Sequence, residues 1–310
     1  MTSGRGSQDP SARVTVAIST RDRAEALSRC LVALLSGTSL PAEIIVVDQS
    51  RSGETQSVVE NYESTQTLVR YIRHEGCGLG KSQNIAFSQA RSSIVAVTDD
   101  DCVPVPEWIE AIEKVFSLPE QMDLVTGRVL PLGPDTPGTF PVASRTSTVR
   151  RDFDRGAMPW EIGSGNNFAA RREWLQRIGG NDERLGPGAP GRGAVDIDLF
   201  YRLARAGACV RYEPDVLVYH QRTDRAGRLA RRVPYGFGMG ALCVLHYFQG
   251  DRRSLRILFR WLVFRAGSLL HALKHRRGMA VYEEALVLWG TLGGVFFGLR
   301  GRSPQERKHS

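Results

Sequence analysis

Four short runs rich in β-branched residues alternate with stretches of helical spacing over the first hundred residues, and this alternation constrains the fold most. The runs cover residues 13–19, 43–48, 68–73 and 93–98. Apolar strands that alternate with helices are typical of a mostly parallel sheet with helices on both faces. The sequence therefore predicts an α/β fold with a doubly wound sheet.

Acidic residues follow the ends of these predicted strands: Asp22, Asp48 and the run from Asp99 to Asp101. Ligands of such sheets bind at the carboxyl ends of the strands, so we expect the acids to gather along one edge. If the chain stays extended, Asp99 and Asp101 point the same way and form a site for Mg²⁺ or Mn²⁺, which would relieve their repulsion. The alternative is a solvated acidic turn that caps the helix near Pro106.

The chain divides into regions of different character. Residues 13–105 carry the strand–helix alternation, and residues 106–222 contain loops rich in proline and glycine, a helical pattern from Val195 and a final strand, VLVYH. Residues 1–12 and 303–310 are polar and predicted to be a disordered leader and tail. Five scattered cysteines without a C-x-x-C pair argue against a disulfide framework or a zinc site and favour a reducing cytoplasm. The leader has no apolar core of a signal peptide.

The region 223–302 is basic and apolar, within a chain of net charge +8. One face of its first long helical stretch carries Arg253, Arg256, Arg260, His271 and Lys274, opposite Leu255, Leu258, Trp261, Leu262 and Leu269. The uncharged run 285–299 is shorter than the roughly 20 residues of a spanning helix. We therefore expect an interfacial or re-entrant segment on an anionic membrane, with the protein peripheral on the inner face. The basic residues do not form a stripe with interleaved aromatics, so no nucleic acid partner is expected.

Five motifs together resemble one enzyme family. They read VAISTRDRAEALSRCLVALL, VVDQSRSGET, TDDDCVP, GSGNNFAARREWLQRIGGNDERLG and AVDIDLFYRLARAG, in the family's order over about residues 13 to 220. The chain resembles the family 2 glycosyltransferases, nucleotide-diphospho-sugar transferases with the Rossmann-like GT-A fold. The resemblance implies a nucleotide-binding half at 13–105, an acceptor half at 106–222 and a C-terminal helical appendage that associates with a membrane.

The resemblance also implies roles for single residues. Thr20, Arg21 and Asp22 would line the nucleoside pocket, Asp48 would hold the base or ribose, and Asp99 and Asp100 would lie on the donor side. Asp101 would ligate the metal, with Asp99 and His220 as further contacts. Gly165, Asn166 and Asn167 would lie on the acceptor side, and Asp196 would be the general base. Asn84 would contact the donor, and Lys81 would supply the charge that many relatives place at Gln83.

One base opposite one metal implies direct displacement with inversion at the anomeric carbon. The expected donor is a nucleotide-diphospho-sugar, with a UDP-sugar as the first choice. The expected acceptor is a glycan or a lipid-linked molecule in cell-surface glycan synthesis. Two positions depart from the family: Val195 replaces the glutamate before Asp196, and Asn181 replaces an aromatic residue.

Other readings stay open at this point. A nucleotidyltransferase would use the same sheet edge, and GCGLGKS is similar to the phosphate loop of a nucleotidase, although Glu75 stands where that loop needs glycine. A noncatalytic sugar-binding protein is a third reading. Asp48 could simply shape a turn, Asp196 could cap a helix, and His220 could be a satisfied strand-end histidine.

Overall fold

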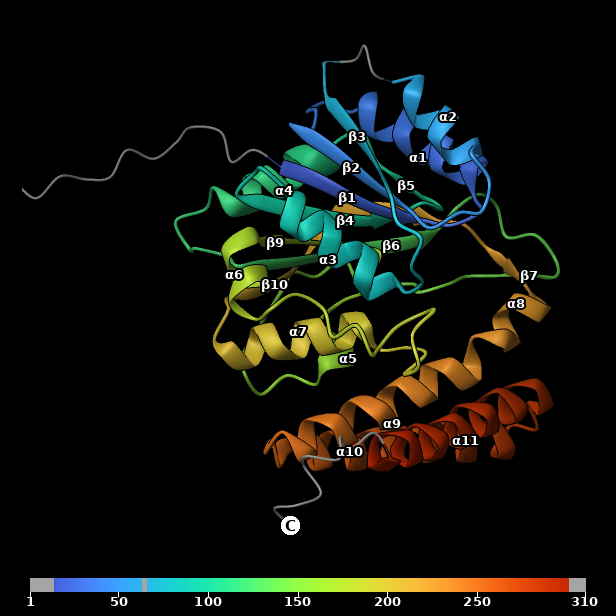
Figure 1. Cartoon of the computed structure of the whole chain (residues 1–310). Coiled ribbons are helices and arrows are strands. Elements are labelled where there is room, and N and C mark those ends of the chain that lie inside the picture. Colours follow the sequence, from blue (N-terminus) through green and yellow to red (C-terminus); the bar gives the residue numbers. More distant parts are fainter. Residues whose placement is uncertain (1–13, 63–65, 301–310) are drawn as a thin grey trace, which may run out of the picture.

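The computed structural model describes residues 14–62 and 66–300. The predicted leader at 1–12 and the predicted tail at 303–310 lie outside these residues. The described chain forms a central sheet with strand order β3-β2-β1-β4-β9-β6-β10-β5 (Figure 1). The larger strands are β1 (Val14–Thr20), β2 (Glu43–Asp48), β3 (Leu68–Arg73), β4 (Ile94–Asp99), β6 (Leu124–Pro131), β9 (Asn167–Arg171) and β10 (Val210–His220). The short strands are β5 (Cys102–Pro104), β7 (Thr139–Phe140), β8 (Arg151–Phe153) and β11 (Thr223–Asp224).

Strands β1 to β4 pair in parallel, and their register aligns their carboxyl ends. Thr20 lies opposite Asp48, Asp48 lies opposite Arg73, and Ser19 lies opposite Asp99. This register confirms that the strand-end acids gather along one edge of the sheet. The sheet is doubly wound as the apolar runs predicted.

Helices cover both faces of the sheet. One face packs against α1 (Ala24–Leu35), α2 (Glu54–Glu60) and α4 (Trp108–Phe116). The other packs against α3 (Leu79–Gln89), α6 (Arg172–Arg177) and α7 (Val195–Ala206). A short helix, α5 (Pro159–Ile162), lies beside α7 (Figure 1). Because both faces are covered, strand β2 is buried at every position and reads as a continuous apolar run.

The second half of the sheet is mixed. Strand β9 runs antiparallel to β4 and β6, while β10 runs parallel to β6. Strand β5 pairs antiparallel with the end of β10, so that Cys102 lies opposite His220. This pairing carries the chain directly from the acidic run to the far end of the sheet.

Four helices follow the sheet: α8 (Arg225–Ala230), α9 (Arg232–Phe248), α10 (Arg253–Lys274) and α11 (Gly278–Arg300). Helix α9 packs on α7, and the two share a hydrophobic core with parts of α10 and α11. A buried hydrogen bond of 2.6 Å joins His246 Nε2 on α9 to Asp198 Oδ1 on α7. The C-terminal helices are therefore built onto the helix that carries Asp196 (Figure 1).

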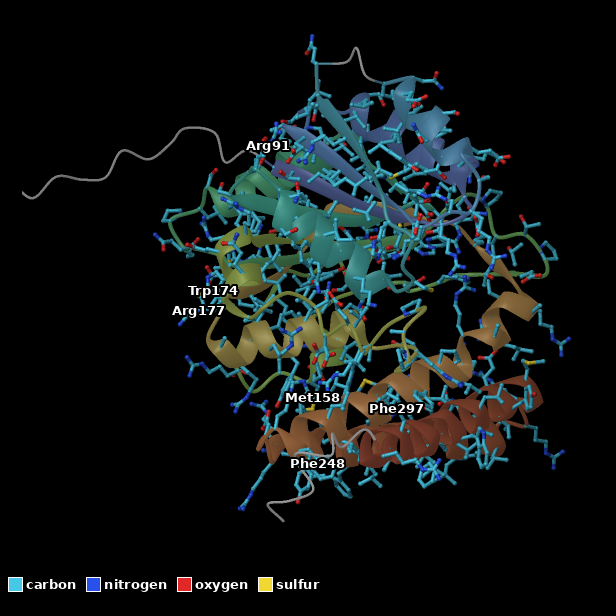
Figure 2. All side chains as sticks on the ribbon, in the orientation of Figure 1. Arg91, Met158, Trp174, Arg177, Phe248 and Phe297 are labelled. Atoms are coloured by element: carbon cyan, nitrogen blue, oxygen red, sulfur yellow. The ribbon has the colours of Figure 1, made fainter. Side chains whose placement is uncertain are left out.

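Glycines bring α9 and α11 into backbone contact. A Cβ on Gly236 would lie 1.9 Å from the Val287 carbonyl oxygen, and one on Gly294 would lie 1.9 Å from the Phe237 oxygen. Phe297 lies on α11 (Figure 2). Its ring packs against Phe237 of α9, with ring centroids 5.6 Å apart. Small residues at such spacing let two helices approach more closely than larger side chains permit.

Helices α10 and α11 turn a broad apolar surface outward. We call it the outer apolar surface; it comprises Leu255, Phe259, Val263, Phe264, Leu270, Leu273, Met279, Tyr282, Trp289, Leu292, Phe296 and Leu299, each at least 38% exposed. Trp261, expected on the membrane-facing side, is instead 1% exposed and donates to Thr291 Oγ1 at 3.1 Å. Helix α11 begins ahead of the run 285–299 and, by length and composition, could cross a membrane. The helix is therefore longer than the uncharged run within it, and the expected interfacial placement stays a prediction.

Candidate active site

The acidic run does not continue as an extended strand. Strand β4 ends at Asp99, the chain turns at Asp100 and Asp101, and β5 begins at Cys102. The expectation that Asp99 and Asp101 lie on one side of an extended strand is therefore wrong. The reason is the pairing of β5 with β10, which requires the chain to turn away from β4.

A guanidinium group balances the acidic run. Arg23 donates to Asp100 Oδ1 at 3.1 Å and to Asp101 Oδ2 at 2.9 Å, while Thr20 Oγ1 donates to Asp100 Oδ2 at 2.8 Å. Burial raises the pKa of Asp100 even though these contacts favour its charged form. Burial, followed by the charges of Asp101 and Asp100, holds the pKa of Asp99 well above its usual range. The negative charge is thus crowded enough to favour a further cation.

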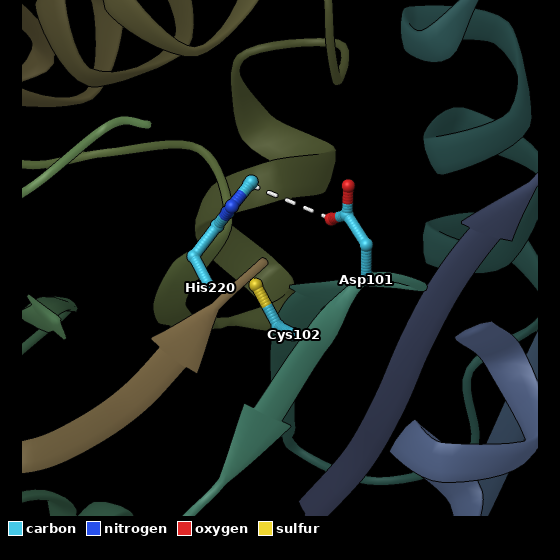
Figure 3. Close-up of side chains that lie close together, drawn as sticks. All are labelled: Asp101, Cys102 and His220. Carbon is cyan, nitrogen blue, oxygen red and sulfur yellow. Dashed lines mark ion pairs between the residues drawn. The ribbon is translucent and has the colours of Figure 1, made fainter. Parts of the chain in front are cut away.

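Asp101 and His220 face each other across the turn, beside Cys102 (Figure 3). His220 Nδ1 is 2.8 Å from the carbonyl oxygen of Gln221, so Nδ1 is the donor in that bond. His220 Nε2 lies 3.4 Å from Asp101 Oδ1, a buried oxygen that has no hydrogen-bond partner among the described residues. In the neutral ring, two acceptors therefore face one another, and a divalent cation would satisfy both.

The chemistry of the ligand atoms favours a hard or borderline cation. A carboxylate with an imidazole suits Mn²⁺, and carboxylates with substrate oxygens suit Mg²⁺. Burial, then the charges of Asp99 and Asp101, holds the pKa of the Cys102 thiol well above its usual range. Cys102 is also fully buried in the core beneath the sheet, so it lies near this pair as a packing residue. The residues present fit Mn²⁺ or Mg²⁺.

The carboxylate of Asp48 is fully buried and organises the adjacent loop. It accepts hydrogen bonds from the Ser50 N–H at 2.7 Å and the Tyr71 hydroxyl at 2.8 Å, and Arg73 lies 3.4 Å away. Asp22 has φ = 55° and accepts from the Arg51 N–H at 2.9 Å. Both aspartates shape the rim of the acidic edge.

Two further donor-side candidates lie on α3. Lys81 is exposed on the first turn of the helix, where its ammonium group has room to move. Asn84 Oδ1 accepts from the Asn181 N–H at 2.7 Å, and its Nδ2 donates to the Asn181 oxygen at 3.1 Å. The Asn181 side chain in turn donates to Gln83 at 2.9 Å. In this structure Asn84 therefore clamps the loop that precedes α7.

Asp196 lies in the first turn of α7, and its Oδ2 accepts from the Gly165 N–H at 2.9 Å. A Cβ on Gly165 would lie 2.7 Å from Asp196 Cβ, so only glycine permits this approach. Burial raises the pKa of Asp196, which suits a group that must take up a proton. The charge of Asp196 also contributes to the raised pKa of Asp99. The departing position, Val195, is buried in the core shared with α9.

Asn166 and Asn167 differ in their surroundings. Asn167 donates to the carbonyl oxygens of Arg128 and Val216, both at 2.8 Å, and accepts from Trp108 Nε1 at 2.9 Å. Asn166 is 3% exposed, and neither side-chain polar atom has a hydrogen-bond partner among the described residues. Asn166 is therefore the one of the pair with free capacity for a ligand.

A cavity of about 420 Å³ opens beside Asp196. Its walls come from residues 141–145, the α5 region, and helices α8, α9 and α10. Its charged lining consists of Asp196, Arg145, Arg228, Arg231, Arg232 and Arg265. The sequence interpretation missed these arginines and Arg23. Arg228 and Arg232 are four residues apart, a helical spacing that could have indicated that these two arginines lie on one face.

Comparisons with known proteins agree on one family. A family model described as glycosyl transferase family 2 matches residues 15–179. The pre-mycofactocin glycosyltransferase of Mycobacterium tuberculosis is 31% identical over 243 residues, covering 75% of this chain and 48% of the relative. Glycosyltransferase AglE of Haloferax volcanii is 25% identical over 254 residues, covering 79% and 77%. The chain thus spans about half the length of the first of these relatives.

Solved structures share the fold. The mannosyltransferase PcManGT from Pyrobaculum calidifontis, in complex with GDP-Man and Mn²⁺, has a TM-score of 0.61 at 19% identity, covering 92% of this chain and 87% of that one. S. aureus TarS 1-349 in complex with UDP-GlcNAc has a TM-score of 0.59 at 16% identity, covering 75% and 66%.

Proposed function

Because this chain belongs to glycosyl transferase family 2 and has the GT-A fold, we propose that it transfers a sugar from a nucleotide-diphospho-sugar to an acceptor hydroxyl with inversion. The observation that carries the proposal is the unpartnered Asp101 oxygen that faces His220 at the sheet edge, where a cation for the donor diphosphate could bind. UDP-sugars are the first donors to test, since UDP-GlcNAc is bound to one structural neighbour and GDP-Man to another.

Asp101 and His220 would hold the divalent cation, through Oδ1 and Nε2. When bound, such a cation neutralises the diphosphate as it leaves. The crowding of Asp99, Asp100 and Asp101 favours cation binding at this edge, and Arg23 keeps the turn folded without one.

Asp196 would act as the general base. As the acceptor oxygen bonds to the anomeric carbon, the bond from that carbon to the diphosphate oxygen breaks, and Asp196 takes the hydroxyl proton. Attack from the face opposite the leaving group inverts the anomeric centre. The Gly165 N–H fixes the orientation of the carboxylate.

The product distinguishes this reaction from its alternatives. Incubation with Mn²⁺, a panel of nucleotide sugars and a mixture of candidate acceptors should release free nucleoside diphosphate. A nucleotidyltransferase would release pyrophosphate, and a nucleotidase would release phosphate. Release of either of these in place of the diphosphate would contradict the proposal.

We further propose that the outer apolar surface seats the enzyme on an anionic membrane, peripheral on the cytoplasmic face. Exposed basic residues of α10, Arg256, Arg260 and Lys274, lie among its exposed apolar residues. Apolar side chains would enter the headgroup boundary while each basic residue near anionic lipid contributes about 1 kcal/mol. A lipid-linked acceptor of cell-surface glycan synthesis would then lie close to the site.

Vesicle sedimentation tests this location. The double variant Phe259→Ser/Trp289→Ser removes two side chains that are 67% and 68% exposed, and it should bind anionic vesicles several-fold more weakly. Val149→Ser, at a residue 70% exposed on the catalytic body, is the matched control and should bind normally. Formation of a dimer through this surface, without binding to vesicles, would contradict the membrane proposal.

A further inference from the structure

Arginines dominate the cavity beside Asp196. Among the described residues, five arginines line it, and Asp196 is the one acidic residue in the lining. They come from three separate parts of the chain: the segment before β8, the α8–α9 region and α10. Such convergence of positive charge from distant segments raises the question of what it binds.

Two carboxylates outside the lining neutralise part of this charge. Glu283 of α11 accepts from Arg228 Nε at 2.5 Å and from Arg232 at 2.7 Å. Arg265 lies 3.3 Å from Glu284 and stacks over the Trp261 ring. These contacts fix the guanidinium groups in place around the cavity.

The other two arginines have no carboxylate partner among the described residues. Arg145 donates to backbone oxygens, at 3.3 Å to Glu161 and 2.8 Å to Gly163. Arg231 donates to Thr223 Oγ1 and to the Gly227 oxygen, both at 2.9 Å. With Glu283 and Glu284 paired to the other three arginines, positive charge still exceeds negative charge around Asp196.

Two buried donors in the same lining also lack acceptors. The Nε–H groups of Arg232 and Arg265 have no hydrogen-bond partner among the described residues. A buried donor left unpaired is costly, and an oxyanion could accept from such groups. Uncompensated charge and unpaired donors point to the same class of ligand.

We propose that this cavity binds a phosphate ester carried by the acceptor substrate, with the reactive hydroxyl presented to Asp196. Calling the ligand an acceptor rests on the proposed function. Guanidinium groups recognise phosphate through paired N–H donors, and several of them suit a group with more than one negative charge. The donor diphosphate is assigned to the acidic edge, whose aspartates do not line this cavity, so the cavity is free for a second anion.

Calorimetry in EDTA tests the site without donor, metal or turnover. The probes are inorganic phosphate and decyl phosphate below its micelle concentration. Arg231→Gln removes an exposed arginine that has no ion pair within residues 14–62 and 66–300, and it should weaken binding by about tenfold or more. Arg231→Lys keeps the charge but loses the paired donors, so its affinity for phosphate should lie between those of the wild type and Arg231→Gln. Arg225→Gln is the matched control, since Arg225 is exposed on α8 and does not line the cavity.

Equal phosphate binding by the wild type and Arg231→Gln, or no binding by either, would overturn the proposal. Tighter binding of decyl phosphate than of inorganic phosphate would identify the source as a lipid-linked phosphate. Equal affinities would identify a soluble phosphorylated acceptor. Asp101→Ala should leave phosphate binding intact, so the anion site stands or falls separately from nucleoside diphosphate release.

Discussion

The proposed donor and acceptor sides of the site carry opposite charge. On the donor side, Asp99, Asp100 and Asp101 crowd together at the sheet edge with Arg23 as their counter-charge. On the acceptor side, arginines outnumber acids around the cavity. An acidic edge binds an anion only through a cation, whereas an arginine-lined cavity binds one directly. The difference predicts that a chelator separates the two sides.

The largest expected effect comes from the carboxylate between the two sides. Asp196→Asn keeps the shape of the side chain but cannot take up a proton. Turnover should fall by roughly 10²–10⁴-fold, while nucleoside diphosphate binding changes little. Steady-state transfer assays measure the first quantity and calorimetry measures the second.

The pH dependence gives an independent check on Asp196. Because burial raises the pKa of Asp196, its carboxylate forms at a higher pH than that of an ordinary aspartate. As the pH falls, activity should therefore decline at a higher pH than it would with an ordinary aspartate as the base. Near-normal turnover of Asp196→Asn would mean that the residue only places negative charge in the first turn of α7 and that another base operates.

The next largest effect is expected on nucleoside diphosphate binding at the proposed donor side alone. Asp101→Ala removes the unpartnered carboxylate oxygen that faces His220, and nucleoside diphosphate binding with Mn²⁺ should weaken at least about tenfold. EDTA should have a similar effect on the wild type. Asp215→Ala, at an exposed residue of β10, is the control. Metal-independent binding that survives in Asp101→Ala would remove the cation from this edge.

The smallest expected effect is on the stability of the arginine-lined cavity on the proposed acceptor side. Burial works to raise the pKa of Glu283, but the hydrogen bond from Arg228 and the charge of Arg232 outweigh it, so the pKa is lowered. The stabilisation by Glu283 is then present above its unfolded pKa and is lost as pH falls through the lower folded value. Glu283→Gln should cost about 1–3 kcal/mol of unfolding free energy at pH 7 and less in acid.

Urea denaturation of the wild type and Glu283→Gln, at pH 7 and in acid, measures how this cost in unfolding free energy depends on pH. Glu284→Gln is the comparison, because its contacts with Arg265 are longer, at 3.3 Å, and its loss should matter less. An equal cost for Glu283→Gln at both pH values would show that the ion pairs do not hold the arginines in place.

The sequence predicted the first half of the fold because strand and helix periods are local properties. It also predicted that the strand-end acids converge, since parallel strands align their ends. It could not predict the turn at Asp100, because that turn depends on β5 pairing with a strand more than a hundred residues later. Nor could it separate Asn166 from Asn167, whose partners lie on distant segments.

The C-terminal helices show the same limit. Helical spacing identified a basic and an apolar side of residues 253–274, but not which apolar residues the protein itself covers. Trp261 is buried by α11, whereas Phe259 remains exposed. That choice follows from the glycine contacts that fix where α9 and α11 meet. No periodicity within one helix contains this information.

Those glycine contacts also determine how the C-terminal helices respond to mechanical load. Where Gly236 meets Val287 and Gly294 meets Phe237, backbone touches backbone, so no side-chain rotation can absorb a displacement. A tilt of α11 would therefore displace α9 as well. From α9 it reaches α7 through the bond between His246 and Asp198, two residues from Asp196. A displacement of the C-terminal helices would therefore reach the carboxylate that we propose as the general base.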